Sequence, residues 1–204
     1  MKMIEYKDYI KTLKEVSVDT SKTDKKGDPI YLTSSLDKVV DFDRFLEDFF
    51  KSSNQHAKKP ESVDAYCFLD EKPCMIEFKN GKINRKNVFA KIGHSVASVL
   101  VKENISPQEF KNNAIFILVY NRDAIDFPDE TYANYNEKLY LAPKEKRHYK
   151  GVEAISGHIS NKANKPLILF GLHTFRNKYF SETMTMDKNI FNQYIEQHNV
   201  TIPK

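Results

Sequence analysis

Two short β-rich runs separated by four polar residues constrain this chain more than any other feature. The runs are VDAYCFL at 63–69 and CMIEFK at 74–79, and the residues between them are DEKP. Both runs alternate and favour extended structure, which predicts an antiparallel hairpin. A two-residue loop places Asp64 opposite Glu77, whereas a four-residue loop places Asp64 opposite Lys79. In either register these three charged side chains lie on one face of the hairpin.

The reverse face of this hairpin is apolar in both registers, so we expect it to belong to the core. Its members are Val63, Ala65, Cys67, Cys74, Ile76 and Phe78. A three-residue loop would mix the two faces and bury a charge, and we discount it. The charged face also carries Tyr66, Phe68 and Met75, which indicates that another element covers it. Carboxylates covered in this way need a cationic partner or an ion.

The paired acids of the predicted hairpin suggest a metal site. Two carboxylates one cross-strand spacing apart repel each other unless a positive charge lies between them, and such oxygen ligands suit Mg²⁺. The backbone carbonyl of Phe78 can supply a further ligand. Lys79 projects from the same face as Glu77, where it can orient or deprotonate a water molecule. The pattern predicts hydrolysis of phosphate esters. The alternative is a solvated sheet face with a cross-strand ion pair.

The E-x-K triplet has little weight by itself, because the chain contains three. Glu5-Tyr6-Lys7 lies in a polar N-terminal segment. Glu109-Phe110-Lys111 follows Ser106-Pro107, which is typical of a helix cap with proline in the first turn. Only Glu77-Phe78-Lys79 ends a predicted strand that faces an aspartate. The context of this triplet therefore carries the interpretation.

Asp64, the triplet at 77–79 and the amphipathic helix that follows resemble the PD-(D/E)XK nuclease superfamily, which includes many restriction enzymes and recombination nucleases. The family pattern of helix, hairpin, helix and strand resembles residues 34–120. The chain departs from the motif at Val63, which stands where the family has proline. The resemblance implies a restriction-endonuclease-like α/β fold, with a mixed β-sheet flanked by helices, and a Mg²⁺- or Mn²⁺-dependent nuclease that acts on DNA more often than on RNA.

The resemblance also assigns roles to individual residues. The catalytic residues that it implies are Asp64, Glu77 and Lys79. The metal ligands that it implies are Asp64, Glu77, the Phe78 carbonyl and Glu47. Glu47 is chosen because the first helix of the family often brings an acid toward the metal; Asp43, one turn earlier, is the alternative. Both acids can equally belong to a solvated helix face.

Basic side chains around the motif predict contacts to the backbone of a nucleic acid. The candidates are Lys82, Lys86, Lys91, Lys146 and Arg147. Lys91 shares the polar side of the next predicted helix with His94, and a lone histidine there is more often a surface side chain than a general acid. Segment 121–165 mixes tyrosines with basic residues, a pattern that can hold phosphates and stack on bases but also suits a solvated insertion.

Apolar periodicity predicts the remaining elements. A helix begins at Ser34-Ser35, and its apolar stripe is Leu36, Val39, Val40, Phe42, Phe45, Leu46, Phe49 and Phe50. The continuous apolar run 114–120 predicts a doubly covered strand that lies beside the Glu77 strand after a crossover helix. The other predicted elements are a weak helix at 4–16, a loop at 21–28, a helix at 87–102, a broken helix at 145–161, a buried strand at 166–172, an edge strand at 178–185 and a last helix capped by Asp187.

Length and composition indicate one domain over residues 1–204, and the resemblance implies that it is nuclease-like. Its parts are a polar N-terminal segment (1–33), the core motif region (34–120), the insertion (121–165) and C-terminal strands and a helix (166–204). The net charge of +4 permits nucleic-acid binding. The absence of a bilayer-length apolar run and of a signal sequence predicts a cytoplasmic chain without a membrane partner. In that compartment Cys67 and Cys74 are expected to be reduced core thiols.

Two alternatives concern the assembly and the activity. A homodimer would suit the cutting of both strands of a duplex. A catalytically inactive nuclease-like module that binds protein or nucleic acid would use the same charged residues as a structural ion-pair network.

Overall fold

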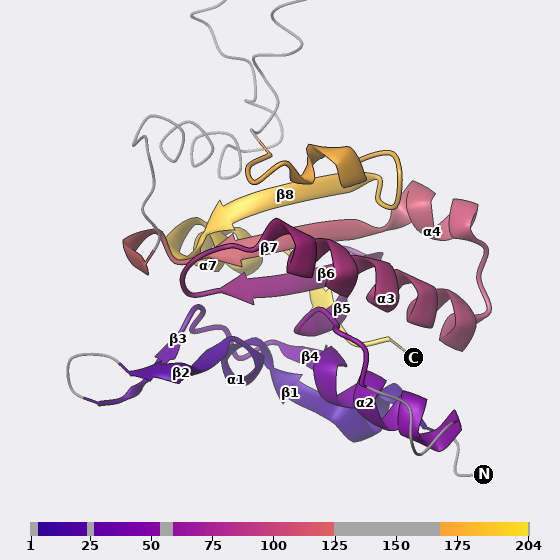
Figure 1. Cartoon of the computed structure of the whole chain (residues 1–204), viewed down its shortest axis with the longest axis horizontal. Coiled ribbons are helices and arrows are strands. Elements are labelled where there is room, and N and C mark those ends of the chain that lie inside the picture. Colours follow the sequence, from indigo (N-terminus) through magenta and orange to yellow (C-terminus); the bar gives the residue numbers. More distant parts are fainter. Residues whose placement is uncertain (1–3, 24–26, 54–58, 125–167, 204) are drawn as a thin grey trace, which may run out of the picture.

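A mixed β-sheet with helices on both faces forms the centre of the chain (Figure 1). The computed structural model describes residues 4–23, 27–53, 59–124 and 168–203. The strands within these residues are β1 Ile10–Thr12, β2 Val18–Thr23, β3 Pro29–Tyr31, β4 Lys38–Asp41, β5 Ala65–Leu69, β6 Lys72–Lys79, β7 Ile115–Tyr120, β8 Glu182–Asp187 and β9 Val200–Thr201. The α-helices are α1 Leu13–Val16, α2 Phe42–Ser53, α3 Arg85–Glu103, α4 Pro107–Asn113 and α7 Lys188–Glu196, and the 3₁₀ helices are η1 Tyr6–Tyr9, η2 Arg122–Ala124 and η4 Leu172–Phe175.

Seven of the strands in the described part of the chain make the main sheet. Its order is β1-β4-β5-β6-β7-β8, with β9 also paired to β5, while β2 and β3 form a separate hairpin. Neighbours from β1 to β6 are antiparallel, and β6, β7 and β8 run parallel. The prediction of an α/β fold with a mixed sheet flanked by helices is therefore confirmed. Most of the predicted insertion, including the helix at 145–161, lies outside the described residues.

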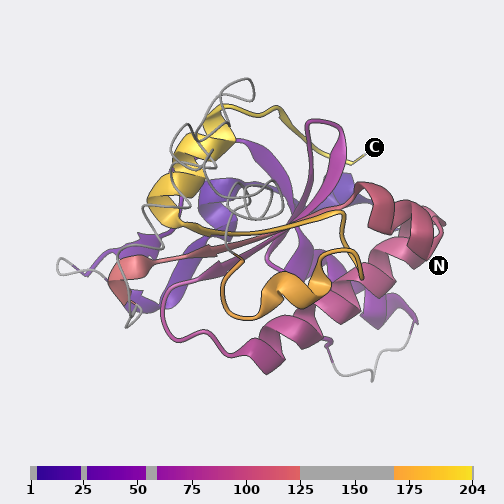
Figure 2. The ribbon, with the colours of Figure 1, turned by 90° about the horizontal axis from the view of Figure 1, so that it is seen from above.

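Helices lie on both sides of the sheet when it is seen from above (Figure 2), and two apolar clusters fill its two faces. Helices α2, α3 and α4 cover one face, and their buried side chains pack against Tyr66, Met75 and Phe116. Helices α1 and α7 cover the other face, against Cys67 and Ile76 among others. Because side chains alternate along β6, Met75 and Glu77 point toward α3, whereas Ile76 points toward α7. The charged side chain of Glu77 therefore lies on the sheet face that α2, α3 and α4 cover.

The β5–β6 hairpin adopts the two-residue loop of the two registers considered. Cys67 lies opposite Cys74 and Leu69 opposite Lys72, which leaves Asp70 and Glu71 as the turn. Both turn residues have positive φ, 47° and 67°, as a type I′ turn requires. Asp70 also accepts a hydrogen bond from the Asn199 N–H and donates its own N–H to the Asn199 carbonyl. These contacts offset part of the cost of the left-handed backbone.

Side-chain caps begin three of the described helices, and the sequence predicts two of these caps, Ser106 and Asp187. Asn84 accepts hydrogen bonds from the first turn of α3, which begins two residues before the predicted start. Ser106 caps α4 with Pro107 in its first turn, and Asp187 caps α7. The second triplet, Glu109-Phe110-Lys111, therefore lies on a helix. Strand β7 is buried throughout and parallel to β6, as predicted.

The N-terminal predictions are wrong in three places. The helix predicted from Ser34 begins only at Phe42, because Val39 and Val40 form strand β4 and pack on opposite faces of the sheet. The helix predicted at 4–16 is replaced by a 3₁₀ turn, strand β1 and a single turn of α-helix. The loop predicted at 21–28 is partly strand, since β2 extends to Thr23. Pairing across the sheet outweighs the helical spacing in these segments.

Three further predictions need correction. Val63 packs on the α3 face rather than with Ala65, because regular strand alternation begins only at Ala65. The described part of the strand predicted at 166–172 is not extended, and η4 begins at Leu172. The edge strand lies at 182–187 instead of 178–185. Among the described residues, no helix is both long and apolar enough to cross a membrane.

Candidate active site

Asp64 and Glu77 come together where the β5–β6 hairpin continues beyond its last regular pair. The Asp64 N–H donates to the Ile76 carbonyl at 3.1 Å, which holds residue 64 beside β6. Its Oδ2 accepts a hydrogen bond from the Phe78 N–H at 2.6 Å. Glu77 points to the same side and is completely buried, whereas 24% of the Asp64 side chain remains exposed. The predicted pairing of the two acids is therefore present.

Two lysines neutralise this pair of carboxylates. The Lys79 Nζ lies 2.6 Å from the Glu77 Oε1, two residues along the same strand. The Lys91 Nζ, from α3, lies 2.8 Å from Glu77 Oε1, 3.1 Å from Glu77 Oε2 and 3.3 Å from Asp64 Oδ1. Lys91 thus supplies the positive charge between the acids that their repulsion requires. The sequence predicted Lys91 as a nucleic-acid contact and missed this role, because helix periodicity does not show which residue of a polar side faces the hairpin.

Burial dominates the protonation of the cluster. It raises the pKa of Glu77 to about 7, with a further contribution from the charge of Asp64, despite the two lysines. Burial also raises the pKa of Asp64, against the opposing effect of Lys91 and the Phe78 N–H. Burial acts to lower the pKa of Lys91, but the charges of Asp64 and Glu77 outweigh it, and the pKa of Lys91 lies above its usual value. Glu77 can therefore change protonation near neutral pH.

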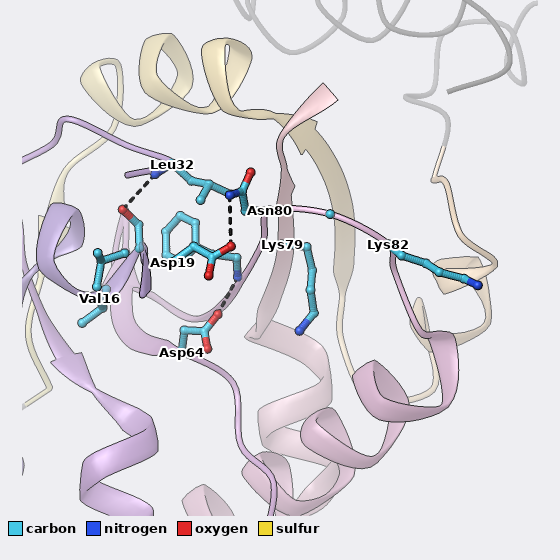
Figure 3. A pocket seen from close by; sticks show the side chains of 11 residues that line it. Val16, Asp19, Leu32, Asp64, Lys79, Asn80 and Lys82 are labelled. Atoms are coloured by element: carbon cyan, nitrogen blue, oxygen red, sulfur yellow. Dashed lines mark hydrogen bonds between the residues drawn. The ribbon is translucent and has the colours of Figure 1, made fainter. Parts of the chain in front are cut away.

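A pocket of about 380 Å³ opens beside the cluster (Figure 3). One wall comes from the end of β6 and the following turn, and the other from the N-terminal segment that leads into β2. Its lining residues are Val16, Ser17, Val18, Asp19, Leu32, Asp64, Phe78, Lys79, Asn80, Gly81 and Lys82. Asp64 and Lys79 connect the pocket to buried Glu77. The charged cluster is therefore accessible to a ligand from one side.

The N-terminal wall of the pocket was not predicted. The Asn80 side-chain amide donates to Asp19 at 3.0 Å, and the Asn121 amide donates to Asn80 at 2.7 Å. Asn80 directly follows the E-x-K triplet, which is a usable signal that it lies near the site. Nothing in the sequence around Asp19 indicates that β2 reaches the end of β6.

Carboxylates near the site only partly fit the predicted set of metal ligands. Asp64 and Glu77 converge on one cation, the Lys91 ammonium, so their oxygens are suited to hold a positive charge. Glu47 instead pairs with Lys51 and Lys59. Within the described ranges, no group of three or more His, Cys, Asp or Glu side chains could hold a metal ion. Glu47 therefore does not complete a metal site with the two acids.

Asp43, the alternative to Glu47, is also engaged elsewhere. It accepts a hydrogen bond from the Ser62 hydroxyl and pairs with Lys59, both at 2.6 Å. Ser62 precedes the site by two residues, so Asp43 supports the loop that enters β5. His94 lies 3.1 Å from the Glu61 carbonyl and holds the same loop. These contacts hold the loop that precedes Asp64 and so help to fix the position of Asp64.

The predicted nucleic-acid contacts are scattered. Lys82 lies at the rim of the pocket, and its side chain extends away from Asp64 (Figure 3). Lys86 is exposed in the first turn of α3. Lys146 and Arg147 lie outside the described residues. Cys67 and Cys74, the predicted core thiols, are both free and buried on the opposite face of the sheet.

Comparisons with protein-family models, with curated proteins and with solved structures found no match to this chain. The chemistry of the site therefore rests on the geometry of its own residues.

Proposed function

We propose that the chain is a Mg²⁺-dependent phosphodiester hydrolase of the restriction-endonuclease-like type that acts on nucleic acid, with DNA the preferred substrate. The convergence of Asp64, Glu77 and Lys79 beside one pocket carries this proposal. The order helix α2, hairpin β5–β6, helix α3 and parallel strand β7 supports it, because this is the arrangement of the family that the motif resembles.

Each residue of the cluster has a role in this reaction. Asp64 and Glu77 would hold the cation, and the bound cation would stabilise negative charge that builds on the scissile phosphate. Lys79, 24% exposed and next to the pocket, would orient the attacking water and place a positive charge beside the scissile phosphate. The Phe78 backbone is fixed beside Asp64 by the hydrogen bond from its N–H.

Lys91 has a different role in the absence and in the presence of the cation. Without a cation, its ammonium contacts both acids. A divalent cation would compete for the same oxygens, and the ammonium would then be available to a substrate phosphate. Its 20% exposure and flexible stem are compatible with such an exchange.

Cleavage of a nucleic-acid panel tests this function. The panel contains supercoiled plasmid, single-stranded DNA and RNA, each incubated with Mg²⁺, Mn²⁺ or EDTA. We expect cleavage with either metal and none with EDTA. Asp64→Asn, Glu77→Gln and Lys79→Ala should each slow cleavage by about 100-fold or more.

The second triplet offers a matched control. Glu109→Gln and Lys111→Ala change the same residue types within the same E-F-K sequence, but on α4, where Glu109 is exposed and Lys111 is half-buried. They should leave cleavage unchanged. The proposal fails if no substrate is cut under any of these conditions, or if Lys79→Ala cuts as fast as the parent.

Light scattering of the purified chain would test the predicted homodimer.

One observation favours a second function, a catalytically inactive module that binds nucleic acid or protein. Lys79 and Lys91 together balance the charge of both carboxylates, so the cluster is an ion-pair network without a metal. For such a module we expect a gel shift that survives EDTA and the Glu77→Ala change, with no cleavage. A gel shift that requires the metal and Glu77 would contradict it.

A further inference from the structure

The two walls of the pocket limit what can reach Asp64. A cube of about 380 Å³ has an edge of about 7 Å. The volume also lies near the lower end of the range for small-molecule sites, about 300–1,000 Å³. The pocket therefore has room for a unit of about one nucleotide, and a paired base would have to leave the helix before it could enter.

The N-terminal wall is held in place by hydrogen bonds on both sides. The Ser17 hydroxyl accepts from the backbone N–H groups of Leu32 and Thr33, both at 3.3 Å. The Thr33 hydroxyl in turn donates to the Asn192 side chain of α7 at 2.6 Å. Across the pocket, Asn80 ties Asp19 to the end of β6. These contacts oppose an outward movement of the wall that would admit a duplex.

The chemistry of the two walls suits the two ends of a nucleotide. Lys79 lies on the β6 wall, near the acids, where a phosphate would meet a positive charge (Figure 3). Asp19 places a carboxylate on the opposite wall, which would repel a phosphate and so favours the base at that end of the pocket. Val16, Leu32 and Phe78 add apolar surface for the face of the base. Lys82 extends outward at the rim, where the next phosphate would leave the pocket.

We propose that the substrate is a single-stranded nucleic acid or an unpaired end, of which one nucleotide enters the pocket between β6 and the Val16–Asp19 segment. The inference rests on the proposed function for its choice of nucleic acid. It adds that paired DNA must be opened before its phosphate reaches Asp64.

Binding measured without turnover tests the inference separately from catalysis. A labelled single-stranded oligonucleotide and the same sequence as a blunt duplex are titrated in EDTA, with fluorescence anisotropy as the readout. The single strand should bind at least tenfold more tightly. Val16→Phe, which fills the pocket from its partly buried wall, should remove this preference, whereas Val101→Phe, at an exposed position of α3 outside the pocket, should keep it.

A rim variant covers the case in which Val16→Phe fails to fold. Lys82→Glu should weaken single-strand binding at least tenfold, whereas Lys72→Glu, at the other end of β6, should not. Equal binding of single strand and duplex, no binding of either, or a preference that both Val16→Phe and Lys82→Glu retain would overturn the inference.

The same samples, incubated with Mg²⁺ or Mn²⁺, separate the inference from the proposed function. Cleavage that depends on Lys79 but shows no preference for unpaired strands supports the hydrolase and rejects the single-strand pocket. A binding preference that depends on Val16, without any cleavage, supports the pocket and rejects the hydrolase.

Discussion

Replacement of Glu77 by glutamine should change how the stability of the protein depends on pH. Glu77 is fully buried, and burial raises its pKa from the ordinary value of 4.5 to about 7. Between these two pH values the folded chain keeps the Glu77 proton, whereas the unfolded chain has released it. The free energy of unfolding of the parent must therefore fall as pH rises through this window. Glutamine has no proton to lose and removes this contribution.

The size of the effect follows from the two pKa values. The interval from 4.5 to about 7 corresponds to about 3 kcal/mol, since each pKa unit is worth about 1.4 kcal/mol. The pKa of about 7 already includes the contacts of Glu77 with Lys79 and Lys91, so their loss in Glu77→Gln adds no further pH dependence between pH 4.5 and pH 8. The stability of Glu77→Gln relative to the parent should therefore increase by up to about 3 kcal/mol from pH 4.5 to pH 8.

Urea unfolding in EDTA, followed by far-ultraviolet circular dichroism, measures this difference, because the chain contains no tryptophan to report by fluorescence. Glu109→Gln, in the exposed first turn of α4, is the control and should change the free energy of unfolding by less than about 0.5 kcal/mol at either pH. A difference between Glu77→Gln and the parent that is the same at pH 4.5 and pH 8 would refute the reasoning. If the stability of Glu77→Gln relative to the parent instead decreases from pH 4.5 to pH 8, the two lysines outweigh burial in setting the pKa of Glu77.

Three further predictions concern the cluster and its hairpin. Lys91→Met should lower the free energy of unfolding by about 3 kcal/mol at pH 8, as measured by urea unfolding, because it removes one partner of a buried ion pair. The decrease should be smaller at pH 4.5, and an equal decrease at the two pH values would contradict this prediction. Mn²⁺ at about 100 times its dissociation constant should raise the free energy of unfolding at pH 8 by about 2.7 kcal/mol, and Glu77→Gln should abolish the increase; a similar increase in both proteins would place the ion elsewhere. Glu71→Gly should raise the thermal midpoint, with a gain of about 1 kcal/mol, because Glu71 has a φ of 67° that glycine adopts without strain; an unchanged or lower midpoint would show that the turn relies on the Glu71 side chain.

The sequence by itself determined the hairpin and much of its surroundings. Strict alternation places Glu77 and Lys79 on one face of β6, and this depends only on local backbone geometry. The caps Asn84, Ser106 and Asp187 act within their own helices, so α3, α4 and α7 follow from short-range patterns, although the sequence analysis predicted only the latter two caps. The apolar run of β7 likewise predicts a strand buried on both faces.

Only the tertiary structure decided which distant residues complete the site. The spacing of Val39 and Val40 fits a helix as well as a strand, and pairing with β1 and β5 selects the strand. Lys91 was one of several polar residues on its helix until the packing of α3 placed its ammonium between the two acids. Asp19 reaches the pocket through the position of the β2–β3 hairpin. Long-range packing and burial set these contacts, and neither leaves a periodic pattern along the chain.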